Sequence, residues 1–425
     1  MHSMRRHRIR FVGAGATLAV AVLLSGCDLT VTNPGPVQDA FLNDEGAFPA
    51  VLQGVKRGHA MAYTRFALDA AMMSREGVPG GLFDTQFKQG ILTSDNSDAN
   101  WNGPQRARWL AEDGARRLEE ALGGSFASNE FAAELILHAG FTNRTLGANH
   151  CTAVFDNGPA TAHTDYFTRA EAHFTRALSV ANAAGRADLA AAAQMGRADV
   201  RMWLGDWSGA NSDATGVATD ATFQMFFGDL AFGDPNEIMF RQASLPWREW
   251  TVWNTFAEGY YTTSGDPRMS WRTNPADPIT MVDNLTFLVS TKFTEEEDPH
   301  TLASGWEMLL IQAEYILVND AANFANAMTL INQVHTRNIG DVSGVALAPV
   351  VAANVTEAWA ALKEERRIEL YLEGRRFGDL RRWGVQSAPG TQPMEDMTGR
   401  SSCFPVGITE VNTNTDPNGP TVVTG

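Results

Sequence analysis

Apolar residues recur at intervals of three and four along much of the chain, which is the spacing of one face of an α-helix. Residues 166–183 place Ala170, Phe174 and Ala177 in such a stripe, and residues 187–204 repeat the pattern. A glycine interrupts it, so the sequence predicts two amphipathic helices joined by a turn. The same periodicity predicts further helices over residues 44–63, 67–73 and 107–122 and from about residue 208.

A second helix pair is predicted over residues 306–318 and 323–337. When Ala198-Asp199 is aligned with Ala313-Glu314, Gly205-Asp206 falls opposite Asn319-Asp320, and each segment then resumes a helical period. This weak self-similarity resembles the helix-turn-helix unit of tetratricopeptide proteins, in which small residues let neighbouring helices pack closely. Chance similarity between two alanine-rich helical hairpins is the alternative.

The segment between the two pairs, residues 219–299, differs in character. It is rich in glycine, proline, tryptophan and phenylalanine. Such a composition predicts loops and short helices inserted between repeat units, where binding sites tend to lie. A second subdomain packed on the helical one is the alternative.

The first residues of the chain are typical of a bacterial export signal. Four arginines among the first ten residues precede an apolar run over residues 11–24, which is too short to span a bilayer. The run ends in Leu24-Ser25-Gly26-Cys27, which resembles a lipobox, in which the cysteine thiol is acylated. We therefore expect a signal peptide over residues 1–26, lipidation at Cys27, a tether over 27–38 and a single domain over 39–425. An ordinary secretory signal with a chance cysteine is the alternative.

The net charge of the chain limits the kinds of partner that we expect. The 425 residues include 33 Lys and Arg against 49 Asp and Glu, a formal net charge of −16. A nucleic-acid-binding protein needs a basic face, so we expect no nucleic-acid partner.

The most specific pattern lies near the C-terminus, over residues 359–384. Glu365 and Arg366 lie on neighbouring faces of a predicted helix that ends near Gly374. A second short helix follows, with an apolar stripe at three-residue spacing and charged residues, including Asp379, around it. Because acids and arginines are interleaved, we interpret this C-terminal signature as a structural ion-pair network that fixes two helices.

The signature resembles the C-terminal motif of the SusD/RagB family of outer-membrane nutrient-binding lipoproteins. The matching residues are Glu365-Arg366, Glu369-Leu370, Glu373-Gly374-Arg375-Arg376 and Asp379-Leu380-Arg381-Arg382-Trp383-Gly384. Ala313-Glu314 with residues 330–337 is similar to the family's Ala-Glu helix and its following Leu-Asn-x-Val-x-x-Arg helix. Residues 404–414 resemble its closing Phe-Pro-Ile-Pro segment, with Gly407 in place of the second proline, and Cys27 is the fourth match.

The resemblance implies an all-α fold of tetratricopeptide-like helix pairs with a loop-rich ligand-binding face. It implies a nutrient ligand, most often an oligosaccharide, and a TonB-dependent, SusC-like outer-membrane transporter as partner. It also implies a lipid-anchored location on the outer membrane, exposed at the surface. A membrane-anchored tetratricopeptide-like scaffold for protein interactions is the alternative function. A glycoside hydrolase would need two carboxylates across a cleft, and the sequence nominates no such pair.

Sugar recognition combines flat aromatic faces with amide and carboxylate groups, which directs attention to two clusters. Trp101 is the leading candidate, because it lies in a polar run with Asp98 and Asn100 and has no apolar neighbours in sequence. The alternative is that Trp101 folds back onto the core. The insert supplies four further candidates: Trp247, Trp250, Trp253 and Trp271. For the first three, spacing at three residues equally suits a packing stripe.

Other chemistry has little support in the sequence. Nucleotide, nucleophile-elbow and zinc motifs are absent, so we expect no enzyme activity, no catalytic residues, no cofactor and no metal site. Cys151 and Cys403 could pair outside the cytoplasm, but their separation in sequence says nothing about their distance in space.

Overall fold

The computed structural model describes residues 39–228, 233–243, 247–337 and 347–425. The predicted signal peptide, Cys27 and the tether lie outside these residues. The chain divides into a short unit that ends at residue 42 and a large unit over residues 43–425, to which the following account applies. Among the described helices, none combines the length and apolar character needed to cross a membrane.

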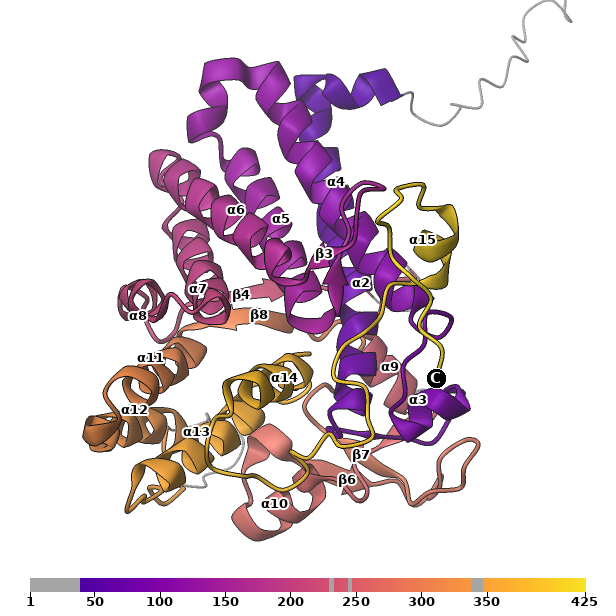
Figure 1. Ribbon diagram of the computed structural model, residues 1–425, viewed down its shortest axis with the longest axis vertical. Coiled ribbons are helices and arrows are strands. Elements are labelled where there is room, and N and C mark those ends of the chain that lie inside the picture. Colours follow the sequence, from indigo (N-terminus) through magenta and orange to yellow (C-terminus); the bar gives the residue numbers. More distant parts are fainter. Residues whose placement is uncertain (1–38, 229–232, 244–246, 338–346) are drawn as a thin grey trace, which may run out of the picture. The chain divides into compact units, whose positions relative to one another are not determined.

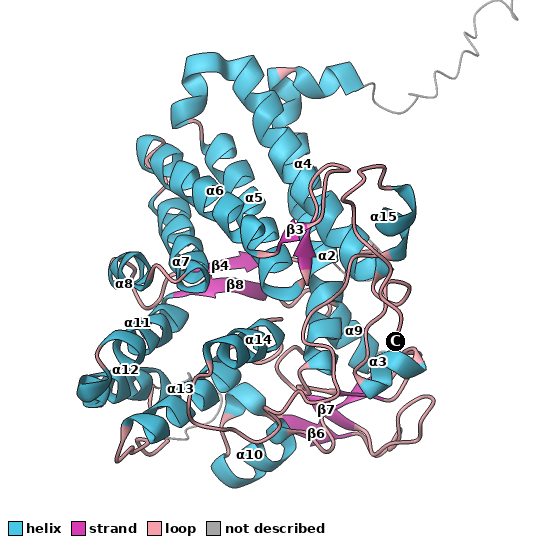
Figure 2. Cartoon of the chain, in the orientation of Figure 1, coloured by secondary structure: helices cyan, strands magenta, loops and turns pink. Residues whose placement is uncertain are grey.

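Helices dominate the large unit (Figure 2). The α-helices are α2 (Phe48–Met73), α3 (Thr85–Gln89), α4 (Asp98–Leu122), α5 (Glu130–Asn149), α6 (Thr164–Ala183), α7 (Ala187–Leu204), α8 (Trp207–Thr215), α9 (Glu237–Ala243), α10 (Phe256–Ser264), α11 (Gly305–Asn319), α12 (Phe324–His335), α13 (Val355–Glu369), α14 (Arg376–Gln386) and α15 (Ile408–Thr413). Short 3-10 helices span Asp39–Asn43, Glu45–Ala47, Gly123–Ser128, Pro267–Met269 and Ala321–Asn323.

The long helices pack in succession, each against the next. The order α2, α4, α5, α6, α7 and α8 continues directly to α11, α12 and α13, so α8 and α11 are neighbours in space although the insert separates them in sequence (Figure 1). This arrangement confirms the predicted all-α, helix-pair fold. Stacked pairs bury a continuous core that no single pair could form alone.

The strands are short and form antiparallel two-stranded ribbons. The pairs are β1 (Val78–Pro79) with β5 (Trp250–Thr251), β2 (Thr152–Ala153) with β3 (Thr161–Ala162), β4 (Thr222–Met225) with β8 (His300–Ser304), and β6 (Trp271–Thr273) with β7 (Leu288–Ser290).

The ribbon of β4 and β8 encloses the insert, because one strand begins it and the other follows it. The ribbon brings the chain back to α8 at Gly305, where a side chain would collide with Ala218 O at 2.1 Å. Glycine is therefore required at this turn into α11. Inside the insert, Trp250 and Leu288 belong to the same buried cluster as Phe66 of α2.

Two predicted boundaries are wrong. Residues 44–63 and 67–73 were expected as separate helices, but α2 runs through both. The helix expected over residues 107–122 begins earlier, because α4 starts at Asp98, inside the polar run that holds Trp101. The polar residues of this run are distributed around a helix, which the sequence alone does not distinguish from a loop.

Helix α5 was missed because it is buried on nearly every face, so it has no polar stripe. Its polar side chains bond to carbonyl oxygens of its own preceding turn. Thr142 donates to His138 O at 3.0 Å, and Asn143 donates to Ala139 O at 2.9 Å.

Cys151 and Cys403 form a disulfide, with Cα atoms 5.1 Å apart. The bond joins the chain just after α5 to the segment that leads into α15. A bridge between His150 and Phe404 runs beside it. The question that the sequence left open is thereby answered.

Candidate functional site

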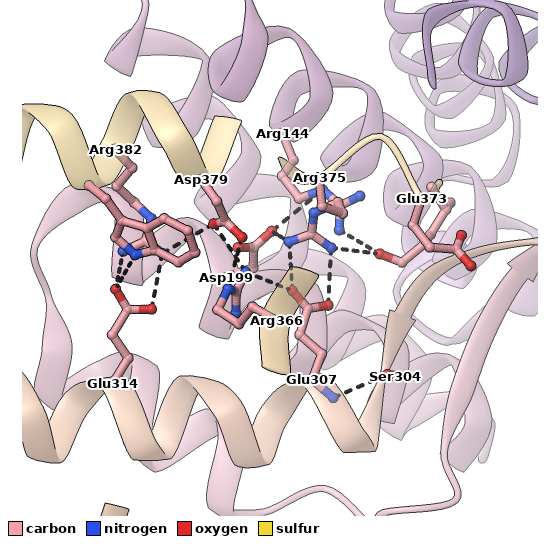
Figure 3. A network of polar contacts seen from close by, with 12 residues as sticks. Arg144, Asp199, Ser304, Glu307, Glu314, Arg366, Glu373, Arg375, Asp379 and Arg382 are labelled. Atoms are coloured by element: carbon pink, nitrogen blue, oxygen red, sulfur yellow. Dashed lines mark hydrogen bonds and ion pairs between the residues drawn. The ribbon is translucent and has the colours of Figure 1, made fainter. Parts of the chain in front are cut away.

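The charged residues of the C-terminal signature form one buried network around α13 and α14 (Figure 3). Arg382 of α14 donates to both oxygens of Glu314 on α11, and the indole of Trp383 donates to the same carboxylate at 3.1 Å. Arg366 of α13 donates to Asp379 at 2.9 and 3.2 Å. Buried charges are tolerated when they are paired and hydrogen-bonded, so these contacts hold α11, α13 and α14 in one arrangement.

Arg375, in the turn between α13 and α14, extends the network to the earlier helices. Its guanidinium donates to Asp199 of α7 at 2.7 Å and to Glu307 of α11 at 2.7 and 3.0 Å. Asp199 and Glu314 are the two acids that the alignment of the helix pairs placed opposite each other, and each binds one arginine of the signature. The predicted ion-pair network is confirmed, and it reaches further than the two helices expected.

A cavity of about 450 Å³ lies where the insert meets the signature. Its volume falls within the range of small-molecule pockets, about 300–1,000 Å³. We call it the insert–signature cavity. Its lining residues are Thr222, Pro267, Arg268, Thr291, Lys292, Phe293, Asp298, Pro299, Thr301, Ser304, Trp306, Arg337, Glu369, Leu370 and Glu373.

Three cations and three carboxylates, those of Asp298, Glu369 and Glu373, lie in the wall of this cavity. Arg268 and Arg337 donate to Glu369 at 3.1 and 2.9 Å. Lys292 Nζ lies 2.7 Å from Glu373. Both signs of charge are present, so the cavity has no strong preference for an ion of either sign.

Neighbouring charges keep Glu373 and Arg268 ionised. Burial alone would raise the pKa of Glu373, but Lys292 and His300 hold it below its ordinary value. Burial alone would lower the pKa of Arg268, but the surrounding carboxylates, that of Glu365 first among them, raise it instead. Charged groups fixed in this way form directional hydrogen bonds with a polar ligand.

Hydroxyl groups and aromatic rings complete the lining. Thr222, Thr291, Thr301 and Ser304 supply hydroxyls. Trp306 is half-buried, and the guanidinium of Arg337 lies over its ring, 4.5 Å from the centroid. The arrangement suits a ligand with many hydroxyls, since donors, acceptors and an aromatic ring surround one space.

The structure contradicts the expectation that Trp101 offers a face to a ligand. Trp101 is 1% exposed and packs with Val154 and Val406, with the ring of His150 5.1 Å away. Asn100 is likewise buried. Asn100 and Trp101 both lie on the inward face of α4, whereas the neighbouring Asn102 is exposed.

Asp98 has a structural contact of its own. Its carboxylate accepts hydrogen bonds from the backbone and the hydroxyl of Thr409, each at 2.8 Å. Asp98 thus fastens α15 to the start of α4 and does not line the insert–signature cavity.

The four tryptophans of the insert also lie outside the cavity lining. Trp250 is fully buried and donates to Ile238 O at 3.1 Å, so it cannot serve as a platform. Trp247 is half-buried against Phe240. Trp253 and Trp271 are also half-buried and pack against the main core. The structure does not bring the seven predicted residues together.

Some of the residues that line the cavity belong to motifs that were recognised in the sequence. Glu369 and Glu373 belong to the signature, and Arg337 ends the second matched helix segment. All three were read as parts of a structural motif. Arg268 and Lys292 carry no recognisable spacing, because the fold of the insert alone brings them together. Among the described residues, no group of three or more His, Cys, Asp and Glu side chains is arranged to hold a metal ion.

Comparison with known proteins gives matches in sequence and in structure. Residues 246–423 match the family model described as SusD family. No curated protein matches the chain. A SusD superfamily protein from Bacteroides thetaiotaomicron is similar in structure, with a TM-score of 0.64 and 13% identity over 89% of this chain and 99% of that chain.

Two further solved structures are similar. A laminarin-binding SusD-like protein aligns with a TM-score of 0.64 and 14% identity, covering 89% of this chain and 99% of that chain. A SusD-like carbohydrate-binding protein from Bacteroides vulgatus aligns with a TM-score of 0.53 and 14% identity, covering 79% and 82%. At these identities the likeness concerns the fold.

Proposed function

We propose that the chain is a SusD-family protein, because residues 246–423 match that family's model, and that it binds a carbohydrate nutrient, without catalysis, in the insert–signature cavity. The observation that carries the proposal is the lining of this cavity, in which hydroxyls, paired charges and Trp306 surround about 450 Å³. The descriptions of two structurally similar proteins as binders of laminarin and of carbohydrate support the class of ligand.

The finer part of the proposal concerns location and partner. We propose that Cys27 is acylated and anchors the protein at the outer-membrane surface, where it passes its ligand to a TonB-dependent, SusC-like transporter. The lipobox-like ending at Cys27 and the family resemblance support this part.

The ligand is tested by screening the purified protein against a glycan array that contains neutral, uronic and sulfated oligosaccharides, followed by titration calorimetry. For any glycan that binds, Lys292→Gln is expected to weaken affinity at least tenfold, because a charged donor at the cavity wall is lost. Arg116→Ala is the matched control, since Arg116 is an exposed, ion-paired cation on α4. Absence of binding across the array, or equal loss in both variants, contradicts the proposal.

The partner is tested by affinity purification of tagged protein from detergent-solubilised outer membrane, with co-purifying proteins identified by mass spectrometry. Near-stoichiometric recovery of a large β-barrel transporter is expected, and Cys27→Ala should remove the protein from the membrane fraction. Recovery with soluble proteins only would favour the interaction-scaffold alternative.

A further inference from the structure

A second pocket lies between α2, α5 and the end of β4. We call it the helix–strand pocket; its volume is about 340 Å³. Gln53, Lys56 and Arg57 line it from α2, His138 from α5, and residues 224–228 with Asp234 from the insert. It shares no lining residue with the insert–signature cavity.

The most exposed aromatic side chain at this pocket is Phe226, which immediately follows β4. It is 69% exposed, whereas Phe223 and Phe227 beside it are half-buried and pack against the main core. A large apolar ring exposed at the edge of a polar pocket offers a flat surface for the apolar face of a ligand.

The charges around the pocket are balanced within the protein. Lys56 Nζ lies 2.7 Å from Glu134, and Arg57 Nε lies 3.0 Å from Asp234. Gln53 and Gln224 add neutral amide groups. A ligand that carries its own charge would compete with these pairs, so an uncharged polar ligand fits better.

The third observation is a buried histidine that lines the pocket. His138 is 2% exposed, and its Nδ1 lies 2.9 Å from Nδ1 of His59, whereas its Nε2 has no hydrogen-bond partner. Burial, aided by Lys56, lowers the pKa of His138 to about 3, so the ring is neutral at physiological pH.

The contact between the two imidazoles couples their tautomers. If His59 donates at Nδ1, then His138 accepts there and carries its proton on Nε2; if His138 donates, its Nε2 is an acceptor. A hydroxyl group can satisfy either form, because it both donates and accepts. A carboxylate or an ammonium group can satisfy only one of them.

We propose that the helix–strand pocket is a second carbohydrate-binding site, which takes a neutral sugar unit with its apolar face on Phe226 and its hydroxyls on the amide, charged and imidazole groups. The choice of a sugar among neutral polyhydroxyl ligands rests on the proposed function. The site itself rests on the pocket, the exposed ring and the unpartnered imidazole nitrogen.

The two sites share the ribbon of β4 and β8. Gln224 of β4 lines the helix–strand pocket, and its amide donates to Thr301 of β8, which lines the insert–signature cavity, at 3.4 Å. An oligosaccharide held at one site therefore meets the same β-ribbon as a sugar held at the other.

The test uses the full folded domain with selectively ¹⁵N-labelled histidine, titrated with laminarihexaose, cellohexaose and maltoheptaose as three neutral glucans. Imidazole nitrogen resonances are followed by NMR. At least one glucan is expected to shift the resonances of His138 and His59 in a saturable way. His138→Gln assigns the signals.

Four variants separate the sites. Phe226→Ala is expected to lower the glucan affinity measured in this titration at least tenfold, and Phe226→Trp is expected to restore it. Trp109→Ala, which removes another exposed aromatic ring, is expected to leave this affinity unchanged. Lys292→Gln should also leave it unchanged, since Lys292 lies at the other site. The inference is overturned if no glucan shifts the His138 signals, or if Phe226→Ala and Trp109→Ala behave alike. If Lys292→Gln weakens the binding of no glycan while Phe226→Ala still weakens the His138 titration, the proposed function is contradicted and this inference is not.

Discussion

Glu314 and Glu373 are both buried carboxylates paired with a basic side chain, but Glu373 lines the insert–signature cavity and Glu314 does not. Glu314 accepts from Arg382 and from Trp383, and the side chains of Glu314 and Arg382 are at most 2% exposed. Glu373 pairs with Lys292, whose side chain is 18% exposed.

The difference shows that one helical signature serves two purposes. Arginine forks enclose the carboxylates of the network on several sides, which fixes the helices and keeps the network buried. In the insert–signature cavity, a lysine and an arginine at the edge retain exposed surface. Pairing there keeps the charges in place, and partial exposure lets them contact a ligand.

The largest expected effect is from Glu314→Ala. Removing this carboxylate leaves the guanidinium of Arg382 and the indole of Trp383 buried with lost partners, which should lower the free energy of unfolding by about 4 kcal/mol. Urea unfolding followed by circular dichroism measures it. Glu120→Ala removes an exposed carboxylate from a surface pair and is the control, with little expected change. Equal losses in the two variants would contradict the structural role of the network.

The next effect concerns a tryptophan outside both regions. Trp101→Ala should lower the free energy of unfolding by about 3 kcal/mol, because a buried side chain leaves a cavity. Trp109→Ala, on the same helix but 50% exposed, should have little effect. Affinity for a bound glycan should be the same in both variants. A selective loss of affinity in Trp101→Ala with an unchanged melting temperature would restore Trp101 as a ligand residue.

A smaller effect is expected at Glu76, which lies just after α2 and contacts the turn between α13 and α14. Glu76 accepts from the backbone N–H of Leu372 at 3.1 Å, and burial raises its pKa to about 7. The folded protein therefore binds this proton more tightly than the unfolded chain does, so stability falls as pH rises from about 4.5 to about 7.

Glu76→Gln should remove this contribution, about 2 kcal/mol between pH 5 and pH 8. Unfolding free energies of both proteins at the two pH values provide the measurement. Identical pH dependence in the variant and the wild type would show that Glu76 is ionised as easily in the folded state as in the unfolded chain.

The smallest expected effect on stability is from Arg337→Ala at the cavity. Glu369 keeps Arg268 as a partner, so the loss should be about 1 kcal/mol, while affinity for a glycan should fall about tenfold. Calorimetric melting and titration separate the two quantities. A loss as large as that of Glu314→Ala would mean that the cavity pairs are as structural as the network.

The sequence predicted the helices whose two faces differ. In α6, Phe167 and Phe174 are buried while intervening residues are exposed, so the period was visible. In α5 almost every position is buried, and no period distinguishes one face. The ion-pair network was predictable in kind because acids and arginines alternate within residues 359–384, whereas its links to Asp199, Glu307 and Glu314 arise only on folding.

The candidate site was less predictable. Tryptophan content identified the insert, but content does not say which face a ring occupies, and Trp250 proved to be fully buried. Arg268, Lys292 and Arg337 come from three separate elements and meet only after folding. No spacing in the sequence indicates that these three residues lie close together.

The disulfide between Cys151 and Cys403 has a consequence for the order of events during synthesis. Its partners are 252 residues apart, so Cys151 cannot pair with Cys403 until the whole segment between them has been made. Domains generally fold from the N-terminus as the chain emerges. The helices from α2 to α14 precede Cys403 in the chain and can therefore stack first, and oxidation then fastens the segment that leads into α15.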